Sequence, residues 1–185
     1  SSVLENAGID FLQITSGVDE DAIKREAEKE NLSPEDIAVR LAVAKAQAVS
    51  QENPDAFVIG ADQVLQCDGE LFDKPQNVEE ALSHLKLFQG TTHQLISSVA
   101  LVFAGETRWA HTETAMLTMR SLSDHTLERY LDASGPEVLE SVGVYRLEGT
   151  GATLFEKIDG DYFTILGLPL LPLLACLRDQ KIIPD

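Results

Sequence analysis

Residues 56–75 decide the fold of this chain, and they read AFVIGADQVLQCDGELFDKP. The first apolar run, which is typical of a buried strand, breaks at Asp62. A carboxylate at that point indicates a candidate functional residue. Asp68-Gly69 favours a two-residue turn with positive φ angles. The apolar residues on either side of that turn are therefore predicted to pair as a β-hairpin.

The register of this hairpin determines which side chains share its open end. Counting from the turn pairs Cys67 with Glu70 and Gln63 with Lys74, so Asp62, Gln63 and Lys74 come to that end together. Side chains alternate between the two faces of a strand, which puts Asp62 on the face opposite to Gln63. A bulge or a twist would bring all three to one side. Both arrangements stay open from the sequence.

Composition limits the size and the partners of the protein. At 185 residues and 44% hydrophobic, the chain is long enough for one core and is expected to form a single domain, residues 1–185. The net charge of −17 argues against nucleic acid polymers and anionic membranes as partners, while 14 Lys and Arg suffice for a small polyphosphate. No apolar run reaches the roughly 20 residues of a spanning helix, so a cytoplasmic protein is predicted. Cys67 and Cys176 are expected to be inert thiols.

The beginning of the chain reads as the end of a helix that Gly8 closes, so an earlier segment is expected outside this sequence. A short strand is predicted for residues 9–14 and a charged helix for residues 21–30. Ser33-Pro34 then starts an amphipathic helix, with Lys45 at the edge of its apolar stripe. Lys45 either extends past the core to solvent or points into a cleft for a phosphate.

The remaining elements alternate between helices and strands, which indicates an α/β protein with a mixed sheet. Helices are predicted at residues 78–88, 123–131 and 168–177, and strands at 94–103, 108–119, 142–145 and 153–155. His93 begins one strand and is expected to be a cap or a surface residue, with a catalytic role as the alternative. Tyr145 is expected in the core.

Several short blocks follow one another in a specific order. They are Gly60-Ala61-Asp62-Gln63, Asp68-Gly69, Lys74-Pro75, Thr92-His93, Glu148-Gly149-Thr150-Gly151, Phe155-Glu156, Gly160-Asp161-Tyr162 and Gly167-Leu168-Pro169-Leu170. As a set they resemble the Maf family, over nearly the whole chain. The resemblance implies a mixed twisted sheet flanked by helices, with a cleft between two lobes as in inosine triphosphate pyrophosphatases. It also implies hydrolysis of a nucleoside triphosphate between the α and β phosphates, which releases a monophosphate and pyrophosphate. The family's opening strand and phosphate loop are expected before residue 1.

The resemblance assigns roles to residues that carry charge. Asp62 becomes the general base or a metal ligand that orients water, where an Asx turn at a strand end is the alternative. Lys45 and Lys74 would hold phosphate oxygens. A divalent cation, Mg²⁺ or Mn²⁺, would bridge carboxylates and phosphates, with Asp62 as one ligand. Glu20 is a second candidate ligand, and a solvated turn residue is the alternative for it.

Two residues bear on the base. Gln63 and Glu148 stand where the resemblance points to the 7-methylguanosine triphosphate branch of the family. A carboxylate at position 148 accepts hydrogen bonds only, so it suits the two donors on the Watson–Crick edge of guanine. Stacking of Tyr145 on the base is the alternative to its core position. A nucleotide-binding regulator of cell division without catalysis is the alternative function, and a homodimer is left open.

Overall fold

The computed structural model describes residues 2–184, and the chain divides into two compact units. Unit 1 comprises Ser1–Gln63, Ile96–Glu113 and Asp161–Asp185, and unit 2 comprises Val64–Leu95 and Thr114–Gly160. Neither unit is a continuous stretch of sequence, because the chain passes from one to the other at four points.

One sheet of five strands runs in the order β2-β1-β3-β4-β5. Its strands are β1 (Phe57–Cys67), β2 (Glu70–Phe72), β3 (Thr92–Phe103), β4 (Glu106–Met119) and β5 (Phe155–Asp159). The pairs β1 with β2 and β4 with β5 are antiparallel. An open sheet with helices around it confirms the predicted α/β class.

The hairpin of β1 and β2 has the turn that the sequence predicts. Asp68 and Gly69 have φ angles of 50° and 87°, and Cys67 pairs with Glu70. Glycine adopts such angles without strain, and aspartate tolerates them better than most residues. β2 ends at Phe72, so the strand pairing stops before it reaches Lys74.

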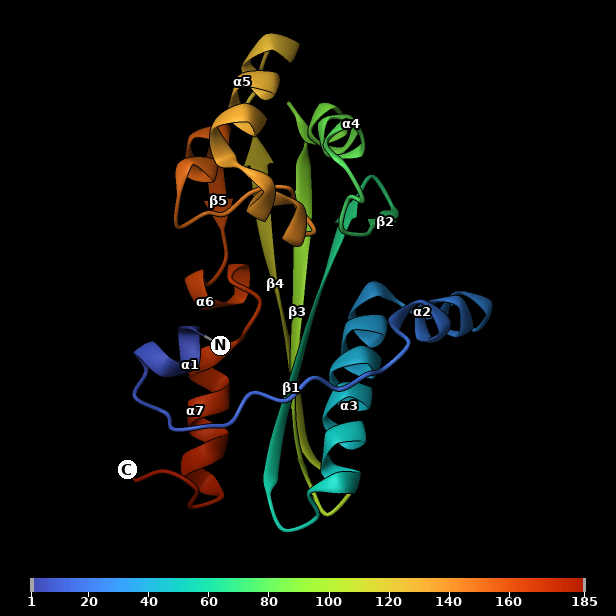
Figure 1. The fold of residues 1–185 in the computed structure, drawn as a ribbon, viewed down its shortest axis with the longest axis vertical. Coiled ribbons are helices and arrows are strands. Elements are labelled where there is room, and N and C mark those ends of the chain that lie inside the picture. The colour runs from blue at the N-terminus through green and yellow to red at the C-terminus, as the bar shows by residue number, and fades with distance from the viewer. Residues whose placement is uncertain (1, 185) are drawn as a thin grey trace. The chain divides into compact units, whose positions relative to one another are not determined.

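Unit 1 packs helices on two faces of its strands, and Figure 1 shows α3 and α7 on opposite sides of them. Its helices are α1 (Ser2–Asn6), α2 (Glu20–Lys29), α3 (Pro34–Glu52), α6 (Tyr162–Ile165) and α7 (Leu170–Asp179). Ile59 and Ala61 of β1 pack against an apolar cluster built largely from α7. Gly60, between them, faces α3. The alternation along β1 thus directs neighbouring residues to different helices.

Unit 2 contains α4 (Val78–Phe88), which has the predicted bounds, and α5 (Asp124–Ser134), which packs against it. Two short 3₁₀ helices, η1 (Pro136–Glu140) and η2 (Thr150–Leu154), follow. His93 lies fully buried among aromatic rings, so its predicted surface position is wrong. The ring centroids of Phe88, Tyr145 and Phe155 lie within about 6 Å of the centroid of the His93 ring.

Two predicted strands are loops in the structure. Residues 9–14 form a loop in which Leu12 is exposed, and the sheet is made from β1–β5. Residues 142–145 also form a loop, because Val144 has a φ angle of 60°, which an extended strand cannot contain. The predicted strand at residues 153–155 is replaced by the end of η2 and the start of β5.

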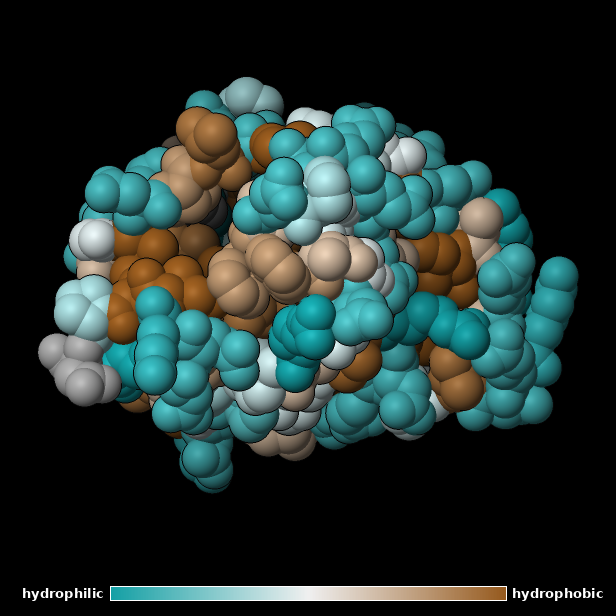
Figure 2. Space-filling model, turned by 90° about the horizontal axis from the view of Figure 1, so that it is seen from below, coloured by the Kyte–Doolittle hydropathy of each residue, from teal (hydrophilic) through white to brown (hydrophobic). Residues whose placement is uncertain are grey.

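The face seen in Figure 2 is mainly polar, with apolar residues in separate patches. This agrees with the acidic composition of the chain. Within residues 2–184, every helix is too short or too polar to cross a bilayer.

Candidate active site

Asp62 lies on β1 under α3, and its side chain is only 8% exposed. The close approach of α3 depends on Gly60, because a Cβ there would lie 2.2 Å from the carbonyl oxygen of Ala42. α3 then presents Lys45, whose Nζ lies 2.5 Å from Asp62 Oδ1. A residue with no side chain therefore permits the contact between the two charged groups.

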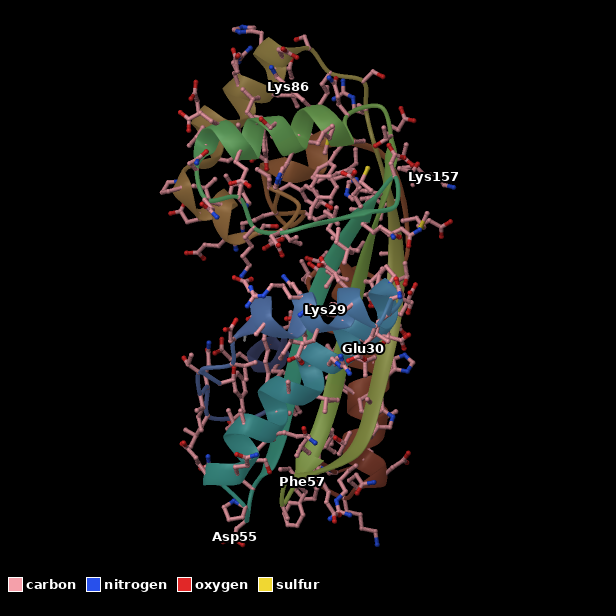
Figure 3. The ribbon with its side chains drawn as sticks, turned by 90° about the vertical axis from the view of Figure 1, so that its right-hand side faces the viewer. Lys29, Glu30, Asp55, Phe57, Lys86 and Lys157 are labelled. Carbon is pink, nitrogen blue, oxygen red and sulfur yellow. The ribbon has the colours of Figure 1, made fainter. Side chains whose placement is uncertain are left out.

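A second carboxylate reaches the same amine. Glu20, the first residue of α2, lies 2.8 Å from Lys45 Nζ. α2 is fixed to α3 at its other end, where Arg40 donates two hydrogen bonds to Glu30, at 3.1 and 2.9 Å. Figure 3 marks Glu30 where the two helices meet. Ala27 is fully buried and adds apolar packing to α2. The helix begins one residue earlier than the predicted residues 21–30, so Glu20 is its first residue and not part of the preceding turn.

Asp62 and Lys45 shift each other's pKa, and the charge of Glu20 acts on both. Burial raises the pKa of Asp62 above its ordinary value, and the charge of Lys45 opposes that rise. Burial also lowers the pKa of Lys45, but the charges and hydrogen bonds of Asp62 and Glu20 outweigh it, so the net change is upward. The lysine therefore stays charged, while Asp62 is a stronger base than an ordinary aspartate.

The oxygen atoms around Lys45 suit a hard divalent cation. Glu20 and Asp62 both direct a carboxylate oxygen to one point, within 2.8 Å of the same nitrogen. Mg²⁺ and Mn²⁺ prefer oxygen ligands, and Mg²⁺ commonly takes one or two carboxylates and fills its other positions with water and phosphate. In the part of the chain that the structure describes, no cluster of three His, Cys, Asp or Glu side chains could hold a metal. A cation here would need ligands from water and substrate.

Gln63 lies on the face of β1 opposite to Asp62, as strict alternation predicts. Its amide nitrogen donates to Ser97 Oγ at 2.8 Å and lies 3.1 Å from the carbonyl oxygens of Thr164 and Ile165. This amide joins the middle of the sheet to α6. It is therefore well placed to fix the strand that carries Asp62.

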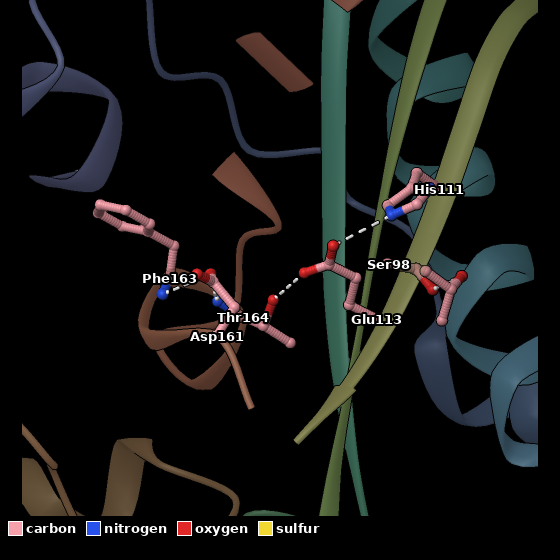
Figure 4. Close-up of polar contacts among 7 residues, drawn as sticks. Ser98, His111, Glu113, Asp161, Phe163 and Thr164 are labelled. Atoms are coloured by element: carbon pink, nitrogen blue, oxygen red, sulfur yellow. Dashed lines mark hydrogen bonds and ion pairs between the residues drawn. The ribbon is translucent and has the colours of Figure 1, made fainter. Parts of the chain in front are cut away.

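A polar network that sequence reasoning missed continues from Thr164. The Thr164 hydroxyl donates to Glu113 Oε2 at 2.5 Å, and His111 Nε2 lies 3.3 Å from the other oxygen of that carboxylate (Figure 4). Asp161 accepts from the backbone nitrogens of Phe163 and Thr164, which begins α6. Only the Asp161 cap had a signal in the sequence, because the contact between β4 and α6 joins residues about fifty positions apart.

The other predicted residues belong to unit 2. Lys74 is exposed in the loop between β2 and α4, and its phosphate contact stays a prediction. Glu148 lines a cavity of about 260 Å³ beside α5 and the glycine-rich loop. Its Oε1 accepts a hydrogen bond of 3.1 Å from Arg146 Nε, which lines the same cavity.

Three further side chains that the sequence singled out are buried in the core. Tyr145 is almost wholly buried, with its hydroxyl 2.7 Å from His93 Nε2, so the core position is confirmed and the stacking alternative is wrong. Cys67 and Cys176 are buried free thiols, and burial raises the pKa of both. A raised pKa lowers the thiolate fraction and agrees with inert cysteines.

Known proteins resemble the chain along nearly its whole length. The family model described as Maf-like protein matches residues 1–180. A 7-methyl-GTP pyrophosphatase from Brucella suis is 50% identical over 183 residues, which cover 99% of this chain and 92% of that protein. A nucleoside triphosphate pyrophosphatase from Nitrobacter hamburgensis is 48% identical, over 98% of this chain and 89% of its own length. A 7-methyl-GTP pyrophosphatase from Rhizobium etli is 46% identical over 96% and 89% of the two chains. Because the Maf-like model covers residues 1–180 and these relatives are 46–50% identical over nearly the whole chain, this chain belongs to the Maf family.

Proposed function

We propose that the protein is a nucleoside triphosphate pyrophosphatase, a hydrolase that cuts between the α and β phosphates. The observation that carries the proposal is the convergence of Asp62 and Glu20 on Lys45. The names of the relatives support the same reaction class. The products are a nucleoside monophosphate and pyrophosphate.

Asp62 has the properties that attack of water on phosphorus requires of a base. Its carboxylate is buried, so it is more basic than usual, and the neighbouring Lys45 favours its charged form. In the proposal Asp62 orients the water and accepts its proton, while Lys45 exchanges a carboxylate oxygen for a phosphate oxygen. Lys74 supplies a further cation for the phosphates. A divalent cation held by Asp62 and Glu20 would neutralise charge on the phosphate oxygens.

The base is proposed to be 7-methylguanine, with Glu148 as its acceptor. Two of the relatives named above are 7-methyl-GTP pyrophosphatases, and Glu148 presents an acceptor carboxylate at a cavity, with Oε1 also accepting from Arg146. Gln63 is proposed to influence base preference indirectly, because its amide is held by Ser97 and by carbonyl groups near α6. Replacing Glu148 by glutamine turns an acceptor into a donor at one of its two positions. That change should lower kcat/KM for 7-methyl-GTP about 10-fold and affect UTP less.

The test of the function is pyrophosphate release from 7-methyl-GTP, GTP, UTP and TTP, with Mg²⁺ or Mn²⁺. Asp62→Asn should lower kcat at least about 10²-fold while nucleotide binding survives, because the base acts mainly in the transition state. Asp55→Asn is the matched control, since Asp55 lies on the exposed turn before β1 (Figure 3). Nucleotide binding by the wild type without any pyrophosphate release would favour the non-catalytic regulator instead.

A further inference from the structure

The cavity of unit 2 has one charged pair in its wall. Among the residues that line it, Arg146 and Glu148 are the only charged ones, and their side chains are 58% and 39% exposed. Arg146 Nε lies 3.1 Å from Glu148 Oε1. The carboxylate that would accept a base is therefore already paired with a cation.

This pair is built into the glycine-rich loop. The Arg146 carbonyl accepts from the backbone nitrogen of Gly149 at 3.1 Å. A Cβ on Gly151 would lie 2.5 Å from the same carbonyl oxygen, so the loop folds tightly around the backbone of Arg146. One residue, Leu147, separates the arginine from the glutamate, and the tight loop holds both at one wall of the cavity.

We propose that Arg146 is a specificity-determining residue, which reduces the preference of this site for cationic bases over neutral ones. The proposal rests on the function and the base site proposed above. Guanine and 7-methylguanine present the same two donors, but only the methylated base carries a positive charge. Arg146 balances the negative charge of Glu148 and donates a hydrogen bond to one of its oxygens. The positive charge of the methylated base therefore adds less binding free energy than it would beside a carboxylate with no arginine.

The decisive variant is Arg146→Gln, which removes the cation and keeps a polar side chain. The ratio of kcat/KM for 7-methyl-GTP to kcat/KM for GTP should rise about fivefold. A fivefold ratio is about 1 kcal/mol at 1.4 kcal/mol per tenfold, the attraction of unit charges about 4 Å apart in bulk water. The rise should shrink at high salt, because the pair is partly exposed. Arg146→Lys retains the charge and should stay near the wild-type ratio.

Arg108→Gln is the matched control. Arg108 forms a similar exposed pair with Glu106, at 3.2 Å, on β4 in unit 1, and it does not line the cavity. Both glutamine variants remove one positive charge, so a general effect of net charge would appear in both. An unchanged ratio in Arg146→Gln, or an equal rise in Arg108→Gln, would overturn the proposal.

Equilibrium binding separates this inference from the proposed reaction. Affinities for 7-methyl-GMP and GMP need no turnover, and their ratio should rise in Arg146→Gln about as much as the kinetic ratio. If the wild type released no pyrophosphate from any triphosphate, the proposed function would fail, and the binding ratio would still test Arg146. If turnover is normal and neither ratio moves, only the role of Arg146 is refuted.

Discussion

Replacing Lys45 by methionine should destabilise the protein in a way that depends on pH. Methionine keeps much of the apolar stem but removes the amine that lies 2.5 Å from Asp62 Oδ1. Asp62 is then a buried carboxyl without its cation, and its pKa must rise further. A carboxyl whose pKa is higher in the folded than in the unfolded state holds a proton that the unfolded chain releases. Stability therefore falls as pH rises above the unfolded pKa.

The size of the effect has an upper bound, because Asp62 can always take up a proton. An ordinary aspartate has a pKa near 3.9, and each pH unit is worth about 1.36 kcal/mol, so protonation costs about 4 kcal/mol at pH 7 and about 1.5 kcal/mol at pH 5. Burial already raises the pKa of Asp62 in the wild type, so part of this cost is present there. We expect a loss of about 2–3 kcal/mol at pH 7 and about 1 kcal/mol or less at pH 5.

The assay is urea unfolding of wild type and Lys45→Met at both pH values. Lys86→Met is the matched control (Lys86 is labelled in Figure 3). Lys86 pairs with Asp124 in a partly exposed ion pair, so the substitution should change stability by about 1 kcal/mol or less. Equal losses for Lys45→Met at pH 5 and pH 7 would refute the reasoning about Asp62. So would a loss at pH 7 no larger than that of the control.

Three further predictions concern packing and buried polar groups. Gly60→Ala should cost about 1–3 kcal/mol, because its Cβ has no room beside the Ala42 carbonyl; a melting temperature equal to wild type would contradict this. Burial lowers the pKa of His93 to about 4, so the unfolded chain binds a proton more readily, and stability should fall by up to about 3 kcal/mol as pH drops from 6.5 to about 4. His93→Gln removes this titrating group, so the unfolding free energy of the variant should depend less on pH between about 4 and 6.5. An equal dependence in the variant and the wild type would contradict the role given to His93. Thr164→Val should cost about 1–2 kcal/mol in urea unfolding, since Glu113 loses a hydrogen bond, and an unchanged midpoint would argue that water replaces the hydroxyl without loss.

The sequence predicted correctly the features that depend on residues close together in the chain, such as turns and helix caps. Asp68-Gly69 specified its turn, and Ser33 capped α3 by accepting from the backbone nitrogen of Asp36. The sequence left open whether Asp62 and Gln63 share a face of β1, and their contacts with Lys45 and with Ser97 place them on different faces. The resemblance, rather than periodicity, pointed to Lys45 as a partner of this site. No spacing rule pairs positions 45 and 62 from different elements.

Predictions failed where a distant neighbour decides the structure. His93 has the pattern of a surface residue at a strand start, yet Tyr145 and Phe155, more than fifty residues further along the chain, help to bury it. Residues 9–14 have the composition of a strand, but a strand exists only where another strand offers hydrogen bonds. The bond between Thr164 and Glu113 left no trace in the sequence, because neither residue type is unusual at its position.

The discontinuous make-up of unit 1 has a consequence for how the protein is made. Its apolar cluster joins Val99 and Leu101 of β3 with Leu173 and Leu177 of α7, which follow the whole of unit 2 in the chain. The ribosome synthesises the chain from its N-terminus, so Asp161–Asp185 is the last part of unit 1 to emerge. Until then, the apolar side chains of β3 in the core of unit 1 stay exposed to solvent. Premature collapse and aggregation are then the main hazards of synthesis. Molecular chaperones that bind the nascent chain should raise the yield of active protein more than they would for a protein whose units fold one after the other.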